Sequence, residues 1–177
     1  MTAPSRLERA SHVAFILTCC ALSIYIGLRA YDRGWRSASV GTPTPYGLGE
    51  RVDDLPGFDP RQTAYTLLAF IRSDCPYCAA SMDSYSTIAH KRNRDVLRFV
   101  AVSPEPIGRI QQYLDRARFS FDGVIAYSGP PLRVRTVPYL LLIDAGGTVR
   151  GGWGSQLVEQ KEREVLDSLR QVKALIE

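Results

Sequence analysis

Cysteine and histidine are scarce in this 177-residue chain, which has four cysteines and two histidines. Cys19 and Cys20 lie in an apolar N-terminal segment, so the remainder of the chain carries a single pair, Cys75 and Cys78. One pair is too few for a scaffold stapled by several disulfides. A structural zinc site needs about four ligands, and beyond the pair this part of the chain offers only His90. We therefore expect no metal site.

Long runs of one charge are also missing. Lysine and arginine number 22 and aspartate and glutamate 18, which leaves a mild net charge of +4. The basic residues are scattered and do not alternate with aromatic side chains, so the sequence argues against a nucleic-acid partner. No internal repeat or low-complexity block is present. The length and the 45% hydrophobic content fit one globular domain with an appendage.

The appendage is an uncharged segment of 17 residues from His12 to Leu28. At roughly 1.5 Å per residue this segment would reach about 25 Å as a helix. Its 17 residues are at the short end of the ~17–25 residues that a membrane-spanning helix needs. It predicts a transmembrane signal-anchor over 12–30, after a short tail of residues 1–11. Arginines on both sides nearly balance, so the positive-inside rule does not set the orientation; they are Arg6, Arg9, Arg29, Arg33 and Arg36.

A cleaved signal peptide is the alternative for this segment. No A-x-A site directly follows the apolar run, although Ser37-Ala38-Ser39 lies further on. Cys19 and Cys20 are interpreted as small apolar helix residues. Residues 31–50 are rich in Gly, Pro and Ser and predict a flexible linker. The remaining residues, 51–177, are expected to form the folded domain.

Within 51–177, short apolar runs alternate with amphipathic ones. This alternation predicts parallel strands, and the Ala145-Gly146-Gly147 turn predicts an antiparallel hairpin after them. The result is an α/β fold with a mixed central sheet and helices on both faces, which is a three-layer arrangement. The expected strands are Thr66–Arg72, Leu97–Val102, Gly123–Tyr127, Leu140–Asp144 and Thr148–Trp153, and the expected helices are Ala79–Lys91, Ile107–Ala117 and Leu157–Ile176.

The Cys75-Pro76-Tyr77-Cys78 string lies where the first strand passes into the first helix. Two cysteines with this spacing can alternate between dithiol and disulfide. Free N–H groups at a helix start favour the thiolate of the first cysteine, and Pro76 suits the first turn of a helix. Cys75 is thus the candidate attacking thiol, and Cys78, one turn further in, is the candidate resolving thiol. Together they would form a redox-active disulfide.

The order of elements, with Cys-x-x-Cys after the first core strand and Val137-Pro138 before the hairpin, resembles the thioredoxin superfamily. The apolar N-terminal segment, the helix expected over Ile107–Ala117 and the string from Val137 to Gly147 look most like its TlpA-type members. Those are membrane-anchored, extracytoplasmic thiol–disulfide oxidoreductases of bacteria. The resemblance covers roughly residues 50–177.

The resemblance implies that Pro138 is cis and that the main chain of Val137 pairs with an extended substrate segment beside the sulfurs. Thr136, Tyr139 and Tyr77 flank these positions and are candidate substrate-binding residues. The resemblance further implies that the substrates are protein thiols or disulfides and that the redox partner is a membrane or periplasmic protein. It implies no cofactor beyond the disulfide. The expected location is the bacterial inner membrane, with a single pass and the domain facing the periplasm or the outside.

The sequence departs from the family in three ways. Asp74 stands where a Trp usually precedes the first cysteine, and Asp74 is expected to cap the helix or face water. The stretch Leu67–Ile71 has no acid that could accept a proton from the second cysteine. The Cys-Pro-Tyr-Cys and Thr136-Val137-Pro138 strings also occur in glutaredoxins. Glutaredoxin-like and peroxiredoxin-like thiol chemistry therefore remain alternatives, as does a non-catalytic binding module on the same fold.

Overall fold

The structure is a computed structural model, and it describes residues 46–53, 55–127, 133–134 and 136–176. All of them belong to one compact unit, Thr44–Glu177. The predicted membrane anchor over 12–30, with Cys19 and Cys20, lies outside the described residues. Among the described residues, no helix combines the length and the apolar character needed to cross a membrane.

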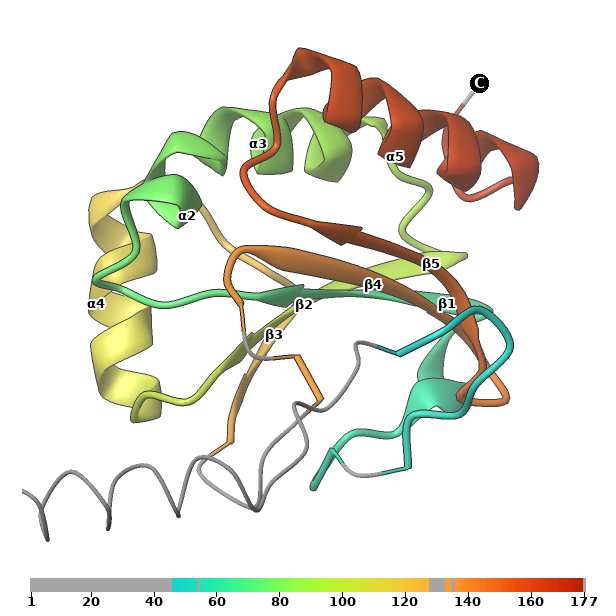
Figure 1. Cartoon of the computed structure of the whole chain (residues 1–177), viewed down its shortest axis with the longest axis horizontal. Helices are drawn as coiled ribbons and strands as arrows, with labels where there is room; N and C mark the ends of the chain where they lie inside the picture. The colour runs from blue at the N-terminus through green and yellow to red at the C-terminus, as the bar shows by residue number, and fades with distance from the viewer. Residues whose placement is uncertain (1–45, 54, 128–132, 135, 177) are drawn as a thin grey trace, which may run out of the picture. The chain divides into compact units, whose positions relative to one another are not determined.

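A five-stranded mixed sheet forms the centre of the domain (Figure 1), as the sequence predicts. Its order is β3-β2-β1-β4-β5, with β1–β2 and β2–β3 parallel and β1–β4 and β4–β5 antiparallel. The central strand β1 is a nearly continuous apolar run, and five of its six residues are buried. The strand bounds are β1 Tyr65–Phe70, β2 Leu97–Ser103, β3 Gly123–Ala126, β4 Tyr139–Asp144 and β5 Val149–Gly154.

The helix expected over Ala79–Lys91 is in fact two helices that meet at Ser81. The Ser81 hydroxyl donates to the carbonyl of Tyr77 at 2.8 Å and accepts from the amide of Leu157 at 3.0 Å. These bonds fasten the junction to the segment that follows β5. The helix bounds are α2 Pro76–Ala80, α3 Met82–Lys91, α4 Ile107–Arg116 and α5 Glu159–Gln171, and a short 3-10 helix, η1, covers Pro60–Gln62.

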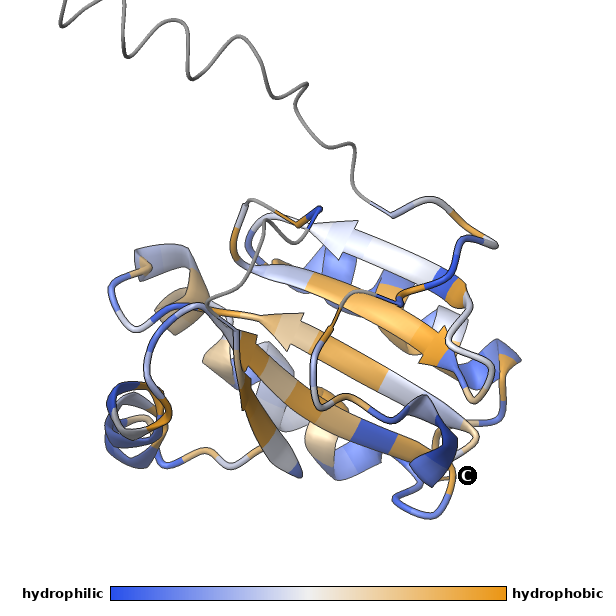
Figure 2. Ribbon diagram, turned by 90° about the horizontal axis from the view of Figure 1, so that it is seen from below, coloured by the Kyte–Doolittle hydropathy of each residue, from blue (hydrophilic) through white to orange (hydrophobic). Residues whose placement is uncertain are grey.

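The helices cover one face of the sheet, so the expectation of helices on both faces is wrong for the described residues. The buried side chains of α3, α4 and α5 all belong to one apolar cluster with Leu67 and Phe99. The cluster on the other face contains no helical residue and is closed by side chains from irregular segments, among them Tyr46, Val52 and Leu55. Figure 2 shows the apolar strands between the more polar surrounding segments.

The segment before η1 belongs to the folded domain. Its main chain pairs with β5 and the preceding turn: Gly49 N–H donates to Val149 at 2.9 Å, Val149 N–H donates to Glu50 at 2.8 Å, and Val52 N–H donates to Gly147 at 2.9 Å. Because its apolar side chains are buried at the same time, this segment replaces a covering helix on the second face.

The hairpin between β4 and β5 is fixed by the Asp144 carboxylate. One of its oxygens accepts from the amides of Gly146 and Thr148, each at 2.9 Å, and the other accepts from Arg150 Nε at 2.8 Å. Gly147 has φ of 80°, a conformation that glycine adopts without a steric penalty. Burial alone would raise the pKa of Asp144. The hydrogen bonds from Thr148, Arg150 and Gly146 outweigh this effect and hold the pKa below its ordinary value.

We expect Asp144→Ala to lower the free energy of unfolding by about 2 kcal/mol, because it leaves turn amides without their charged acceptor. A carboxyl group with a lowered folded-state pKa stabilises the protein above its unfolded pKa and loses that contribution as the pH falls through the folded value. The difference in the free energy of unfolding between Asp144→Ala and wild type should therefore be smaller in acid. Urea unfolding at neutral and acidic pH measures this difference. Asp167→Ala, which removes an exposed pair with Arg170, is the control and should stay within about 0.5 kcal/mol.

Candidate active site

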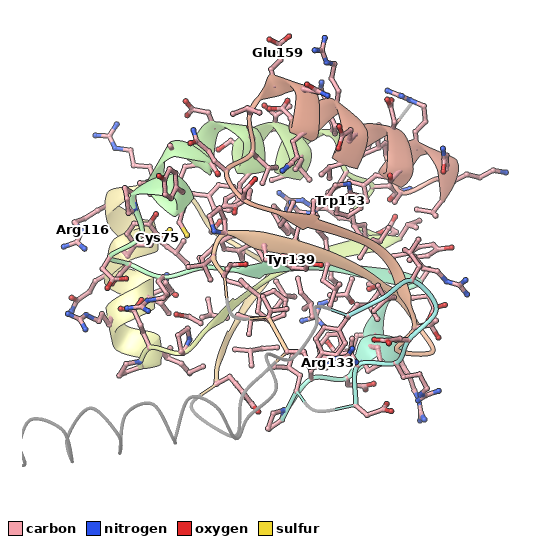
Figure 3. All side chains as sticks on the ribbon, viewed as in Figure 1. Cys75, Arg116, Arg133, Tyr139, Trp153 and Glu159 are labelled. Carbon is pink, nitrogen blue, oxygen red and sulfur yellow. The ribbon has the colours of Figure 1, made fainter. Side chains whose placement is uncertain are left out.

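Cys75 forms the start of helix α2. It is the N-cap residue, with extended backbone (φ −93°, ψ 111°), and its Sγ accepts a hydrogen bond from the Cys78 amide at 3.2 Å. Pro76 is the first residue of the helix, where a missing N–H breaks no bond. The capping position is therefore held by the sulfur itself, and Asp74 instead faces water, the other arrangement expected for it. Figure 3 shows Cys75 at the start of α2.

Cys78 lies one turn further along α2 and is fully buried. Both cysteines are free, so the structure represents the dithiol. Burial, followed by the hydrogen bond with Cys75, raises the pKa of the Cys78 thiol far above its ordinary value. The pair thus combines a partly accessible sulfur at a helix start with a second sulfur that is shielded and protonated.

The segment before β4 meets Cys75 from the other side. The Val137–Pro138 peptide bond is cis, and the Val137 carbonyl accepts a hydrogen bond from Cys75 Sγ at 3.6 Å. Pro138 is buried and Thr136 is exposed. The structure therefore brings Cys75, Cys78, Val137 and Pro138 together, although 62 residues separate Cys75 from Val137.

The two tyrosines named from the sequence lie in different surroundings. Tyr77 is 60% exposed on α2, next to the cysteines. Tyr139 is 8% exposed and belongs to the cluster on the sheet face opposite Cys78. Its ring stands edge-on to Phe70, with centroids 6.3 Å apart. Tyr77 is thus accessible to a substrate at the surface, whereas the Tyr139 side chain packs in the core.

Three solved structures share this architecture. A candidate thiol:disulfide interchange protein DsbE from Chlorobium tepidum aligns with a TM-score of 0.51 and 22% identity, over 70% of this chain and 99% of its own. StoA from Bacillus subtilis gives 0.50 and 17%, over 71% and 98%. A cysteine-to-serine mutant of PrxQ from Xylella fastidiosa gives 0.57 and 13%, over 73% and 99%. The chain has a thioredoxin-like fold. No protein-family model and no curated protein matches its sequence.

This thioredoxin-like domain has a buried carboxylate that no local sequence pattern singles out. Glu105, in the loop between β2 and α4, is 9% exposed and accepts from Ser73 N at 2.6 Å and from Ser73 Oγ at 2.7 Å. Ser73 lies two residues before Cys75, so Glu105 anchors the loop that leads to Cys75. The carboxylate comes from a segment 32 residues away, and only the tertiary fold reveals the contact.

Asp74 takes no part in this anchoring. Its carboxylate accepts from Arg72 Nε at 3.0 Å and Nη2 at 2.7 Å, and its side chain is 62% exposed. An exposed pair of this kind contributes little to stability. Across the described part of the chain, no group of three or more His, Cys, Asp or Glu side chains is placed to hold a metal ion.

Iodoacetamide should alkylate Cys75 quickly and leave Cys78 unmodified in the native protein. The thiolate is the reactive form, and Cys78 is buried with a raised pKa, so it is both shielded and protonated. Peptide mass mapping after short exposures, native and in urea, measures the two sites separately. Rapid native labelling of Cys78 would contradict the described environment.

Replacing Glu105 by Ala should lower the free energy of unfolding by about 2 kcal/mol, because the Ser73 amide and hydroxyl lose a charged acceptor. Glu105→Gln retains an oxygen for the amide and an NH₂ group that donates to the hydroxyl, so it should cost clearly less. Urea unfolding of the two variants beside wild type provides the comparison. Equal effects from both would show that the hydrogen bonds to Ser73 are not what Glu105 contributes.

Proposed function

We propose that this protein is a thiol–disulfide oxidoreductase that exchanges disulfides with protein thiols through Cys75 and Cys78. The observation that carries the proposal is the position of Cys75 Sγ, which caps helix α2 and contacts the carbonyl of Val137, next to the cis proline. This arrangement supports Cys75 as the nucleophile, Cys78 as the resolving thiol and the main chain at Val137 as the place where a substrate docks.

The helix start supports the attacking thiol. Free backbone N–H groups at a helix N-terminus and the helix dipole both favour negative charge. The Cys78 amide already donates to Cys75 Sγ, and this bond strengthens when the acceptor becomes a thiolate. The helix start thus places a hydrogen-bond donor at the sulfur that would attack a substrate.

The exchange proceeds in two displacements. The Cys75 thiolate attacks one sulfur of a substrate disulfide, and the first substrate thiolate leaves with the electron pair of the broken bond. Cys78 then loses its proton and attacks Cys75 Sγ, which releases the second substrate thiolate and forms the Cys75–Cys78 disulfide. Two electrons pass to the substrate, and its two thiolates take up two protons. The reverse sequence oxidises a dithiol.

The exposed surroundings fit a protein substrate. Tyr77, in the first turn of α2, is 60% exposed, and Thr136 is exposed next to Val137. An extended segment of a partner can pair with main-chain groups of such an edge, as in other cases of strand addition. The binding site in this proposal consists of Tyr77, Thr136, Val137 and Pro138.

The proposal extends to the location of the protein. The uncharged segment from His12 to Leu28 has the length of a short membrane span, and the fold is shared with a candidate thiol:disulfide interchange protein. We infer a TlpA-type, membrane-tethered enzyme at the bacterial inner membrane, with its domain on the extracytoplasmic side. Its redox partner would be a membrane or periplasmic protein.

Insulin reduction with dithiothreitol tests the activity. The wild-type protein should accelerate the precipitation of insulin chains, and Cys75→Ser should bring the rate down to that of dithiothreitol alone, because the attacking sulfur is gone. Cys78→Ser should accumulate mixed disulfides with substrates, because the resolving sulfur is missing.

Other outcomes would identify the alternatives. Equal activity of wild type and Cys75→Ser would overturn the proposal. Turnover that requires peroxide or glutathione would favour peroxiredoxin-like or glutaredoxin-like chemistry. A Cys78→Ser protein that captures no partner covalently, together with an inactive wild type, would favour a binding module.

A further inference from the structure

A pocket with a volume of about 730 Å³ lies where the end of helix α3 meets the segment that follows helix α5. Its size is typical of small-molecule sites, which usually enclose roughly 300–1,000 Å³. The described residues that line it include three cationic side chains and no acidic one. They are Lys91, Asn93, Arg170, Lys173, Leu175 and Ile176.

Main-chain pairing between two distant segments builds this pocket. The Ile176 amide donates to the carbonyl of Lys91, and the Asn93 amide donates to the carbonyl of Ala174, each at 2.8 Å. The Ala174 side chain is fully buried, so the segment after α5 is fixed against the end of α3. The fold therefore holds Lys91 and Lys173 around one cavity, although they are far apart in the sequence.

Lysine is rare in this chain, and two of its three lysines line the pocket. Lys91 and Lys173 are exposed, and neither forms an ion pair with any of the described residues. The third lysine, Lys161, is bonded to two oxygens of the segment after β5, at 2.6 and 2.7 Å. Arg170 pairs with Asp167. The pocket thus carries two ammonium groups whose charge is not balanced by a neighbouring acid.

The polar side chains of the pocket are donors, which fits a phosphate group. Lys91 and Lys173 offer ammonium groups, and Arg170 offers a planar fork of N–H groups. The carboxamide oxygen of Asn93 accepts from the Asp95 amide at 3.1 Å, which leaves the NH₂ group to donate. A phosphate has several acceptor oxygens and more negative charge than a carboxylate, so it balances more of the positive charge.

We propose that this pocket binds a phosphate group, carried by an anionic phospholipid headgroup or by a soluble compound. The three cations and the Asn93 amide contact its oxygens. Ile176, which is 64% exposed, offers an apolar surface to the group that carries the phosphate. The pocket is separate from the cysteines, because Cys75 precedes α2 whereas Lys91 ends α3. The inference therefore does not depend on the proposed function.

The backbone at Lys173 allows its charge to be removed without disturbing the fold. Lys173 follows the end of α5 with φ of 54°. Its amide donates to Arg170 at 3.0 Å, and the Ala174 amide donates to Leu169 at 2.9 Å. Glycine is the usual residue at this position, because it adopts a positive φ without strain. Arg118 ends α4 in the same way, with φ of 52°, but does not line this pocket.

Footprinting of the lysines by acetylation and peptide mass mapping tests the proposal on the full-length protein in non-ionic detergent. One arm adds sodium phosphate. The other adds dihexanoyl phosphatidylglycerol, with zwitterionic dihexanoyl phosphatidylcholine as its counterpart, and sodium chloride matches the ionic strength throughout. We expect protection of Lys91 and Lys173 that saturates with concentration in at least one arm. Lys161, which is already bonded, should react at an unchanged rate.

Replacing Lys173 by glycine should raise the concentration for half-protection of Lys91 about tenfold, the effect of one hydrogen bond between charged groups. Lys173→Arg should restore most of the protection, because it retains the charge. Arg118→Gly is the matched control and should leave the protection unchanged. Both glycine variants should unfold at about the urea concentration of wild type, because glycine suits both positions.

The outcomes decide between the sources and the failure of the proposal. Protection by sodium phosphate supports a soluble phosphate compound, and protection by phosphatidylglycerol alone supports a lipid headgroup. Equal protection by sodium chloride or by phosphatidylcholine, or equal protection of Lys161, would overturn the inference. So would an unchanged half-protection in Lys173→Gly. If that variant is unstable, Lys91→Gln with Lys173 as the reporter provides the same test.

The two proposals fail separately. Insulin reduction by Lys173→Gly should equal that of wild type, because the cysteines lie outside the pocket. An inactive wild type that still shows protection of Lys91 and Lys173 would refute only the proposed function. An active wild type without this protection would refute only the phosphate site.

Discussion

The site depends on the pairing of β1 with β4. The two strands are antiparallel, and Phe70 at the end of β1 lies opposite Tyr139 at the start of β4. The residues just after β1 therefore meet the residues just before β4 at one edge of the sheet. Cys75 belongs to the first group and Val137–Pro138 to the second, so the register brings the two segments to the same end of the sheet, where Cys75 Sγ contacts the Val137 carbonyl. A slip by one residue would turn each buried side chain of β4 to the other face, and burial on both faces of β1 opposes such a slip.

Tertiary contacts outside the cysteine motif hold the loop and the helix in place. Glu105 fastens the Ser73 amide and hydroxyl on one side of Cys75, and Ser81 connects the end of α2 to Leu157 on the other. Each contact joins segments that are far apart in the sequence. The two cysteines thus lie between two segments that are held by hydrogen bonds. This favours a constant position of the sulfur atoms, which a displacement at sulfur requires.

The sequence predicts much of the sheet because its signals are local. The apolar runs of β1, β2 and β4 and the Gly146-Gly147 turn identify strands and a hairpin within a residue or two, and the spacing of Cys75 and Cys78 identifies the candidate thiols. The break at Ser81 has no signal in the local sequence, and the Leu157 amide that bonds to the Ser81 hydroxyl there lies 76 residues away. Glu105 has no local pattern, and its contact with Ser73 arises only when the segment after β2 folds against the loop before α2. The face covered by α4 is decided by tertiary packing in the same way.

The irregular segment that covers the second face sets a limit on how this chain can be shortened. Residues 46–58 shield Leu68, Val100 and Ile143 and occupy main-chain groups at the start of β5. A fragment that began at β1 would present a bare apolar sheet with an unprotected edge, the combination that favours self-association of strands. A recombinant domain should therefore begin before Tyr46, even though the first regular strand begins only at Tyr65.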